Sequence, residues 1–271
     1  MPESSLAIVI VSYDVRADLA RCLESLDGQV PPAAITVVDN RSSDGTLAWL
    51  AEHRPAVRAI DAGGNLGFSR ANNLGIRATT SDLVLLLNPD TVVPAGAIRA
   101  LVSTLDAHPD AAALGPRLVD GEGRVELSFG PMISPWGEFR QRRLQRACEA
   151  GARWAVAEVA RQTSTAGPRD WGSGACLLAR RRDLDAVGLL DERYFMYTED
   201  VDLCAALRAR GRSVWFEPSI TVHHLRGRSA SAAPGPTAQR RRESHLAFYR
   251  KHHPRWAPLL AFWLRRRGFD V

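Results

Sequence analysis

Cysteine is scarce in this chain, and the few that occur lie far apart. The 271 residues include four cysteines, and no two of them form a CxxC pair. This spacing excludes a cysteine zinc site and a disulfide framework, and it favours a reducing cytosol. Lysine is rarer still, with Lys251 as the only one. Arginine therefore carries almost all of the positive charge.

Long hydrophobic runs and targeting signals are also lacking. No apolar run reaches the roughly 20 residues that a bilayer-spanning helix needs. Residues 1–5 carry no positive charge and the apolar run at 6–11 is too short, so no signal peptide is expected. No GxGxxG follows the first apolar run, which argues against an NAD-dependent dehydrogenase. We therefore expect a cytoplasmic protein, either soluble or peripheral on the inner face of the plasma membrane.

Apolar runs of strand length alternate with amphipathic segments through the first hundred residues. The expected strands are 6–12, 35–39, 57–60 and 82–88, and the expected helices are 15–26, 70–78, 96–107 and one after "SSDGT". This alternation predicts an α/β fold with a mainly parallel sheet flanked by helices. The length and the 45% hydrophobic content suit one large domain.

The second half is less regular. We expect a hairpin at 118–128, a helical stretch at 136–162, strands at 175–179 and 214–216, and a helix after Asp200. The small, polar, proline-broken segment 227–239 predicts a mobile loop. These features divide the chain into a main domain, residues 1–225, and a C-terminal part, residues 226–271, which combines the mobile loop with basic amphipathic helices.

Polar side chains follow the ends of several predicted strands. The run "LVLLLNPDT" must stop near Asn88, because Pro89 cannot donate to a sheet and restricts the residue before it. Asp90 is thereby delivered to the carboxyl edge of the sheet, where α/β proteins bind ligands. Two further clusters are expected at strand ends, Asp39-Asn40 and Glu199-Asp200 with Asp202. Repeated carboxylates at this edge suit a divalent cation with a phosphate-bearing ligand. A helix cap or a surface charge is the alternative at any one of these positions.

Seven motifs occur in one order along the chain: "IVIVSYD", "VVDNRSSDGT", "GGNLGFSRANNLGI", "LVLLLNPDT", "WGSGACLLARR", "GLLDERYFMYTEDVDLCAAL" and "HLRGRS". Together they resemble the family 2 glycosyltransferases of the inverting GT-A type, and above all their rhamnosyltransferase branch. The resemblance covers about residues 6–230. It implies a GT-A (nucleotide-diphospho-sugar transferase) fold, to which the C-terminal helices are an appendage.

The resemblance implies site residues at the matching positions. For the donor nucleotide these are Ser12, Tyr13, Asp39, Asn65, Gly67, Asn72 and Asn88. For the acceptor they are Trp171, Gly172, Ser173, Gly174 and Glu199. For a metal, Mn²⁺ or Mg²⁺, they are Asp90 and His224, with His223 as the alternative histidine. Asn88 stands where the family usually has an aspartate, which removes one negative charge from the metal site. Two alternatives remain equally open: Gly67 suits an ordinary turn, and Trp171 suits a buried aromatic side chain.

Asp200 matches the position of the family's catalytic base. Such a carboxylate accepts the proton of the acceptor hydroxyl while the oxygen attacks opposite the departing diphosphate. Asp202 is expected to cap the following helix, and Arg226 or Arg228 to stabilise the leaving group. The alternative is that these acidic residues have no catalytic role and lie at a helix N-terminus because the helix dipole favours negative charge there. Segment 227–239 is expected to close over the donor.

These residues predict a metal-dependent inverting hexosyltransferase. The expected donor is dTDP-L-rhamnose, and the expected acceptor is a hydroxyl of a cell-surface glycan or of a polyprenyl-diphosphate-linked sugar. Alternatives are a UDP-sugar-dependent transferase (galactofuranosyl, glucosyl or N-acetylglucosaminyl) and a non-catalytic scaffold that keeps the nucleotide-sugar fold.

The C-terminal tail is strongly basic. From residue 225 onward, eleven Arg or Lys face two acidic residues, which favours an anionic partner. Aromatic and apolar residues at 255–269 favour peripheral membrane association, with packing on the domain or in a homodimer as the alternative. No nucleic-acid partner is expected, because the arginines belong to no recognisable RNA- or DNA-binding motif.

Overall fold

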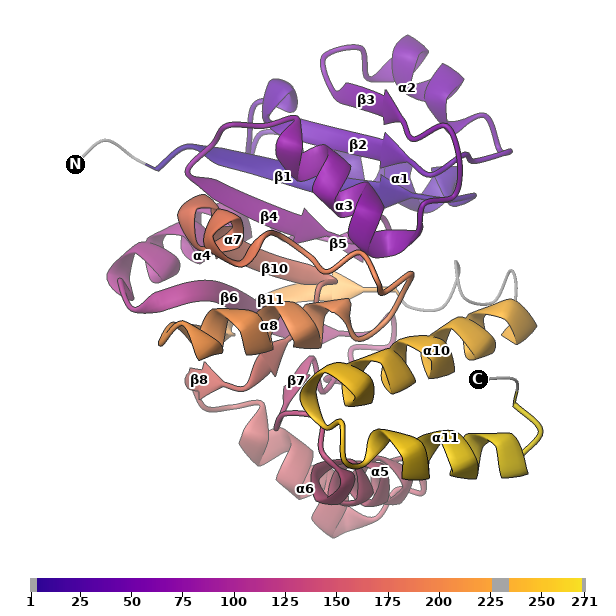
Figure 1. Ribbon diagram of the computed structural model, residues 1–271. Helices are drawn as coiled ribbons and strands as arrows, with labels where there is room; N and C mark the ends of the chain where they lie inside the picture. Colours follow the sequence, from indigo (N-terminus) through magenta and orange to yellow (C-terminus); the bar gives the residue numbers. More distant parts are fainter. Residues whose placement is uncertain (1–3, 226–233, 270–271) are drawn as a thin grey trace.

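One mixed sheet organises the residues that the computed structural model describes, 4–225 and 234–269 (Figure 1). Its order is β3-β2-β1-β4-β10-β6-β11-β5, and β8 pairs with β11. The strands are β1 (Leu6–Ser12), β2 (Ile35–Asp39), β3 (Arg58–Asp61), β4 (Leu83–Leu87), β5 (Thr91–Val92), β6 (Ala111–Val119), β8 (Gly167–Arg169), β10 (Cys176–Arg180) and β11 (Ser213–His224). A separate short pair joins β7 (Phe129–Gly130) to β9 (Trp171–Gly172).

The sheet is parallel in its N-terminal half and mixed in its C-terminal half. Strands β3, β2, β1 and β4 all run in one direction. Strand β10 enters between β4 and β6 in the opposite direction, whereas β11 is parallel to β6. The expected α/β fold is therefore observed, with a sheet that is parallel from β3 to β4 and is interrupted by the antiparallel β10. A short apolar run does not reveal its own direction, which is why the sequence did not indicate the reversal at β10.

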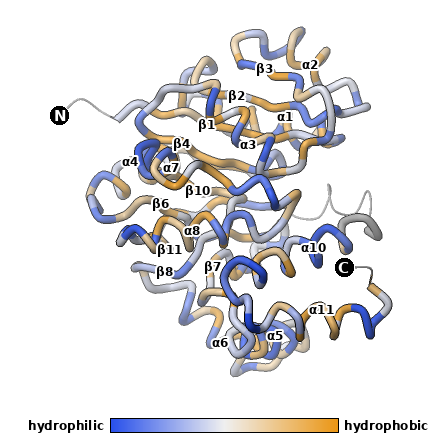
Figure 2. Tube along the Cα trace, viewed as in Figure 1, coloured by the Kyte–Doolittle hydropathy of each residue, from blue (hydrophilic) through white to orange (hydrophobic). Residues whose placement is uncertain are grey.

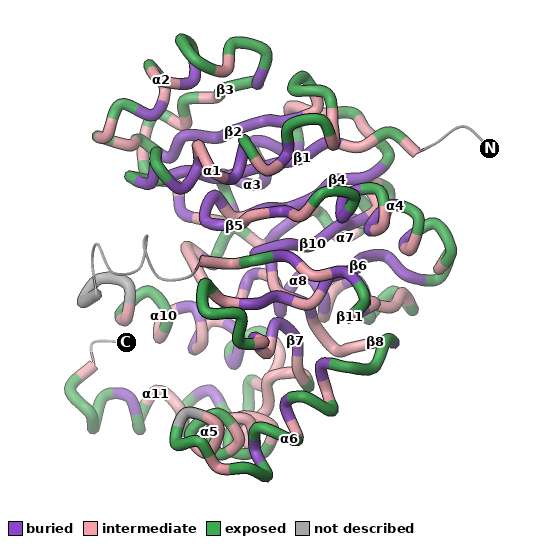
Figure 3. The backbone as a smooth tube through the Cα atoms, turned by 180° about the vertical axis from the view of Figure 1, so that it is seen from behind, coloured by how far each residue is buried: buried purple, intermediate pink, exposed green. Residues whose placement is uncertain are grey.

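Helices cover both faces of the sheet, as the alternation of side chains along a strand requires. Ile8 and Ile10 pack with α1 (Arg16–Leu26), α2 (Thr46–His53) and α4 (Ala97–Ala107). Val9 points the other way and packs with α3 (Gly67–Arg77), α7 (Arg181–Val187) and α8 (Glu199–Ala209). Figure 3 shows the result as buried central strands between helices that expose their outer sides. A 3-10 turn, η1 (Pro32–Ala34), precedes β2.

Two expected helical boundaries differ from the observed ones. The stretch predicted at 136–162 is two helices, α5 (Pro135–Glu149) and α6 (Arg153–Gln162), which are separated at Gly151 by a φ of 70°. Of the loop predicted at 227–239, residues 227–233 lie outside the described residues, and so do Arg226 and Arg228. From Pro234 onward the chain is helical in α10 (Pro234–His252), so that part of the loop prediction is wrong. Prolines are tolerated there because the first N–H groups of a helix have no intrahelical partner.

The C-terminal helices α10 and α11 (Ala257–Arg266) pack on the rest of the protein through a third apolar cluster. This cluster joins Leu246 and Phe248 of α10 to Val201 of α8 and to Tyr194, which precedes α8. Figure 2 shows apolar strands at the centre and largely hydrophilic outer turns on α5 and α10. Among the described helices, none has the length and hydropathy to cross a bilayer. The division at residue 225 stays a prediction.

Candidate active site

The turn after β4 is held rigidly at the carboxyl edge of the sheet. The backbone N–H of Asn88 donates to the Ala175 carbonyl at 2.9 Å, and Thr91 Oγ1 donates to the Asn88 carbonyl at 2.8 Å. Strand β5 then pairs with β11, which sets Thr91 directly opposite His224. This pairing places Asp90 beside His224, although 134 positions separate them in the sequence.

His224 lies between two carboxylates. Its Nε2 is 3.4 Å from Asp90 Oδ1 and its Nδ1 is 3.2 Å from Glu126 Oε2. Burial lowers the pKa of His224, but hydrogen bonds and charges from Asp90 and Glu126 outweigh it and raise the pKa to about 9. The neighbouring His223 is exposed and pairs with Val92, so it points away from Asp90. The structure thus brings Asp90 together with His224 and leaves His223 outside.

Asp90 and His224 form a two-residue cluster. Within residues 4–225 and 234–269, no group of three or more His, Cys, Asp or Glu is arranged to hold a metal ion. A carboxylate oxygen and an imidazole nitrogen are nonetheless suitable ligands for a divalent cation, with further ligands supplied by a diphosphate or water. The contact of Glu126 with the far nitrogen of His224 is of the kind that orients metal-binding histidines. The residues therefore fit a divalent cation.

Asp200 lies beside the Asn88–Asp90 turn. Its Oδ2 accepts the backbone N–H of Gly174 at 3.0 Å, and its Oδ1 accepts the N–H of Val201 at 2.8 Å. The next residue, Ala175, binds Asn88, so two successive backbone contacts link the carboxylate to the turn. Burial raises the pKa of Asp200 despite these hydrogen bonds. A partly exposed carboxylate with a raised pKa is suited to accept a proton from a bound hydroxyl.

Unusual backbone conformations precede Asp200. Tyr197 and Thr198 have φ angles of 70° and 74°, in the left-handed region that residues other than glycine rarely adopt. Each such residue costs on the order of 1 kcal/mol or more and persists only where the surrounding structure enforces it. The loop before α8 is therefore held in a strained conformation immediately before the candidate base.

Glu199 is a second carboxyl group in a different environment. It is buried, and its Oε2 has no hydrogen-bond partner. Burial raises the pKa of Glu199 well above its ordinary value, and the negative charge of Asp200 raises it further. The two adjacent carboxyl groups therefore differ in environment, because Asp200 accepts two backbone hydrogen bonds whereas one oxygen of Glu199 accepts none.

Glu199→Gln is expected to stabilise the protein increasingly as the pH rises. The folded-state pKa of Glu199 is raised, so folding favours the protonated form of this side chain. The resulting stabilisation is fully present below the unfolded pKa of about 4.3 and is lost as the pH rises through the folded-state pKa. Gln resembles the protonated form at every pH. The melting temperature of the variant should exceed that of the wild type more at about pH 8 than at about pH 5.

Glu192→Gln is the control of opposite sign. A hydrogen bond from Asn73 lowers the pKa of Glu192, so this variant should lose stability at neutral pH and lose less on acidification. An equal effect of Glu199→Gln at both pH values would contradict the raised pKa of Glu199.

Two of the predicted nucleotide-binding residues lie opposite each other on adjacent strands. Ser12 ends β1 and is in register with Asp39 at the end of β2. Asp39 Oδ2 accepts the N–H of Ser42 at 3.0 Å, whereas Asp39 Oδ1 and Ser12 Oγ are buried without a hydrogen-bond partner. Buried polar atoms without partners are costly, so these two atoms favour a polar ligand at this edge. Tyr13 is exposed beside them.

The glycine-rich turn before α3 is organised by Asn40, which the sequence pattern places beside Asp39 at the end of a strand. Its Oδ1 accepts the N–H of Leu66 at 2.8 Å, and its Nδ2 donates to Asn65 Oδ1 at 3.1 Å. Asn65 in turn accepts the N–H of Gly67. Asn72 donates to the Phe68 carbonyl within the helix. Contact of Asn65, Gly67 and Asn72 with a nucleotide stays a prediction.

Gly67 is required by close packing as well as by its conformation. Its φ is 79°, and a Cβ atom there would lie 2.3 Å from the Phe195 carbonyl oxygen. The Phe68 N–H donates to that same carbonyl at 2.6 Å, so the turn is fixed against the loop that leads to Asp200.

Gly67→Ala is expected to lower the free energy of unfolding by about 3 kcal/mol, which combines a left-handed alanine with overpacking. Gly63→Ala is the matched control, because Gly63 has a similar φ of 70° but open space around its Cβ position. The control should lose only about 1 kcal/mol. Urea unfolding measures both variants, and equal losses would show that contact with Phe195 is unimportant.

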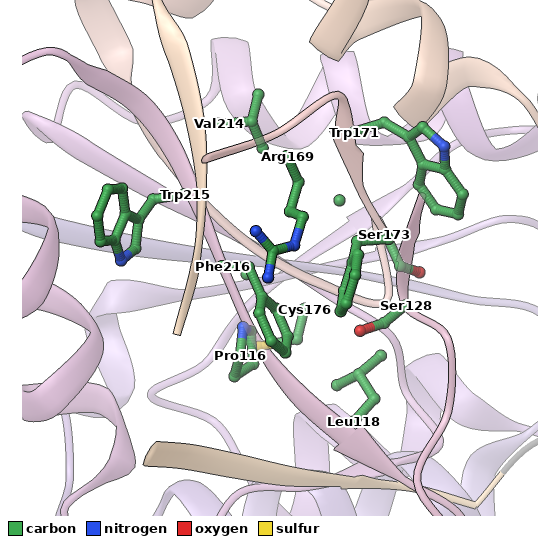
Figure 4. A pocket seen from close by; sticks show the side chains of 13 residues that line it. Pro116, Leu118, Ser128, Arg169, Trp171, Ser173, Cys176, Val214, Trp215 and Phe216 are labelled. Carbon is green, nitrogen blue, oxygen red and sulfur yellow. The ribbon is translucent and has the colours of Figure 1, made fainter. Parts of the chain in front are cut away.

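The residues predicted to contact the acceptor lie around β9. Trp171 is partly buried, and its indole N–H donates to the Pro131 carbonyl at 3.0 Å. The backbone N–H of Ser173 donates to the Ser128 carbonyl at 2.8 Å. Figure 4 shows Trp171 and Ser173 at one side of a small cavity that Arg169 and Phe216 also line. Gly174 binds Asp200 through its backbone. The acceptor role of Trp171, Gly172, Ser173, Gly174 and Glu199 stays a prediction.

Asp202 does not cap α8, which corrects the sequence prediction. It lies inside the helix, which begins at Glu199, and it is only 2% exposed. It accepts hydrogen bonds from Tyr194 Oη, Lys251 Nζ and His252 Nε2. Because Lys251 and His252 belong to α10, the carboxylate attaches the C-terminal helix to the helix that carries Asp200.

Two residues with clear structural roles were missed from the sequence: Glu126 and Asn73. Asn73 on α3 exchanges two hydrogen bonds with the backbone of Leu190. Glu126 lies in the predicted hairpin, where nothing indicated a contact with His224. The Asn72-Asn73 pair is the only sequence signal that pointed toward Asn73.

Comparisons with known proteins agree with this geometry. The family model described as Glycosyl transferase family 2 matches residues 7–163. A protein of Mycobacterium tuberculosis described as N-acetylglucosaminyl-diphospho-decaprenol L-rhamnosyltransferase is 34% identical over 94% of this chain and 87% of its own length. The low-salt glycan biosynthesis hexosyltransferase Agl10 of Haloferax volcanii is 30% identical over 77% of this chain and 62% of its own length.

A solved structure shares the fold. It is the mannosyltransferase PcManGT of Pyrobaculum calidifontis, in complex with GDP-Man and Mn²⁺, with a TM-score of 0.62. The superposition covers 96% of this chain and 68% of that one, at 16% identity, and therefore supports the GT-A fold alone. Taken with the matched motifs and the relatives above, it leads to one conclusion: the chain belongs to glycosyl transferase family 2, in its rhamnosyltransferase-like branch.

Proposed function

We propose that the protein transfers L-rhamnose from dTDP-rhamnose, with inversion, to a hydroxyl of a sugar carried on a polyprenyl diphosphate. The main support is the contact of Asp200 with Gly174, which holds a carboxylate of raised pKa beside the Asn88–Asp90 turn. The sugar and the acceptor follow the description of the mycobacterial relative, which is similar along nearly its whole length, and dTDP as the donor nucleotide is our own expectation from the family resemblance.

Inversion requires one base on the acceptor side of the sugar. Asp200 accepts the proton of the acceptor hydroxyl as its oxygen attacks the anomeric carbon from the face opposite the diphosphate. The hydrogen bonds from Gly174 and Val201 fix both carboxylate oxygens, so the base is oriented before the acceptor arrives.

Asp90 and His224 would hold the divalent cation that the fold family uses, with Glu126 orienting the imidazole. A bound cation neutralises charge on the departing diphosphate. The imidazole favours Mn²⁺ over Mg²⁺. Asn88 in place of a second carboxylate leaves Asp90 as the anionic ligand of the turn, so metal and diphosphate are expected to bind together.

Selective heat stabilisation by Mn²⁺ with dTDP is the expected result of the direct test. At 100 times the dissociation constant, a ligand stabilises by about 2.7 kcal/mol, which is several degrees in melting temperature. Asp90→Ala and His224→Ala should abolish the shift. His223→Ala is the matched control and should keep it, because His223 is exposed and points away from Asp90.

The same measurement separates the rival functions. Stabilisation by UDP in preference to dTDP would favour a UDP-sugar-dependent transferase, and incubation with labelled dTDP- and UDP-sugars would then identify the donor. Stabilisation by no nucleoside diphosphate would overturn the transferase proposal in favour of a non-catalytic scaffold.

A further inference from the structure

Large apolar side chains are exposed on the end of the molecule that carries α5, α6 and α11. On α5, Trp136 and Phe139 are 78% and 62% exposed, and on α11, Leu259 and Phe262 are each 60% exposed. We call this set the aromatic rim, and it consists of Trp136, Phe139, Trp154, Trp256, Leu259, Phe262 and Trp263. Exposure of this many aromatic side chains in one region is unusual for a protein surface that contacts only water.

The parts of the aromatic rim on α5 and on α11 are both held against α10. Glu138 of α5 binds His245 and Tyr249 of α10, at 2.5 and 3.0 Å. His253, just after α10, contacts the Ile133 carbonyl at 2.7 Å, and α11 packs against α10 through Leu260. In Figures 1 and 3, α5 and α11 accordingly lie at the same end of the molecule, opposite α2. Helices α5, α6 and α11 therefore contribute to one surface, although α11 is far from α5 and α6 in the sequence.

Arginines accompany the exposed aromatic rings. Arg267 lies over the Trp263 ring at 4.0 Å, Arg266 over Phe262 at 5.4 Å, and Arg143 over Trp154 at 6.0 Å. No acidic residue occurs from 244 to 269. On α5 and α6, Glu138 is bound by Arg142 and His245, and Glu158 by Arg161. The aromatic rim is thus apolar at its surface and positive around it.

We propose that the aromatic rim is a docking surface for an anionic phospholipid bilayer. Exposed Trp and Phe side chains beside arginines have the composition of elements that lie in the membrane interface, where apolar groups enter the headgroup region and cations meet lipid phosphates. An open groove beside α11, lined by Pro258, Phe262 and Arg265, adds to this surface.

A second copy of the chain fits this surface less well. A two-fold interface would bring the arginines of one copy against the same arginines of the other, and like charges at an interface are repelled. An anionic bilayer, by contrast, is complementary to both the charge and the apolar groups. The surface also lies outside the Asp90, His224 and Asp200 site, so the proposal goes beyond the transfer reaction and does not depend on it.

Co-sedimentation of the full chain with lipid vesicles tests the proposal. The protein should bind vesicles containing phosphatidylglycerol and should bind neutral phosphatidylcholine vesicles at least about tenfold more weakly. The double variant Arg266→Gln/Arg267→Gln should weaken binding about tenfold, and so should high salt. Arg99→Gln, at an exposed arginine on α4, is the control and should bind like the wild type.

The apolar half of the surface is tested by Trp136→Ser/Phe139→Ser and by Leu259→Ser/Phe262→Ser. Each pair should lower the affinity for the anionic vesicles about tenfold or more, because it removes two inserted side chains. Since all four residues are exposed, the melting temperature should not fall. Absence of vesicle binding by the wild type would overturn the proposal. So would a dimer, measured by light scattering, that the apolar variants dissociate while vesicle binding is unchanged.

Discussion

Asp200→Asn is expected to lower kcat by about 10³-fold, within the range that removal of a positioned general base produces. An amide has nearly the same shape as the carboxylate, and its oxygen still accepts one of the two backbone hydrogen bonds from Gly174 and Val201. It does not accept the proton of an acceptor hydroxyl. Nucleoside diphosphate binding should change little, because Asp200 is expected to act on the acceptor.

Initial rates of rhamnose transfer, together with the dTDP-induced shift in melting temperature, check this prediction. Asp185→Asn is the matched control, because Asp185 is an exposed aspartate on α7 and its loss should leave kcat unchanged. An Asp200→Asn enzyme that keeps a tenth or more of the wild-type kcat would show that another group is the base. Loss of the nucleotide-induced shift would instead indicate a damaged site.

Much of the N-terminal half could be predicted from the sequence because its signals are local. The apolar runs at 6–12, 35–39 and 82–88 reappear as β1, β2 and β4 within a residue at each end. The reversed strand β10 and the helical start of α10 at Pro234 were not predictable in this way. Strand direction depends on the partners that a chain finds, and α10 is held by tertiary contacts such as those of Leu246 and Phe248.

The candidate site could be predicted from the sequence only in part. The strand end at Asn88 and the exposed carboxyl edge followed from local rules about proline and apolar runs. The pairing of Asp90 with His224 followed from family resemblance, since nothing local links positions 134 residues apart. Glu126 was missed because its partner His224 reaches it only after β11 has paired with β6. Asp202 was misjudged because a helix N-terminus is a common location for a carboxylate, whereas its actual partners lie on α10.

The partners of Asp202 lead to the second large expected effect. Asp202→Ala is expected to lower the free energy of unfolding by about 3 kcal/mol, because it removes a buried carboxylate that accepts three hydrogen bonds. The substitution leaves Lys251 and His252 without their shared partner and the buried Tyr194 hydroxyl without its acceptor. Urea unfolding measures the loss. Asp27→Asn is the control, because its ion pair with Arg54 is exposed and should contribute less than about 1 kcal/mol.

The same substitution should also slow the reaction in the protein that remains folded. Helix α10 holds the strained loop before Asp200, since Ser244 Oγ donates to the Met196 carbonyl at 2.8 Å and Arg240 and Arg241 lie over Phe195 and Tyr197. Weaker attachment of α10 allows that loop to relax away from its left-handed conformation and to displace the base.

We therefore expect Asp202→Ala to lower kcat about tenfold or more at a temperature well below its melting point, because small displacements of a catalytic group are costly. Lys251→Met separates the causes, because it removes one cation and leaves His252 and Tyr194 bound to Asp202. It should lose less stability and less activity than Asp202→Ala. Full activity in Asp202→Ala, despite its lower stability, would show that α10 stabilises the fold without positioning the base.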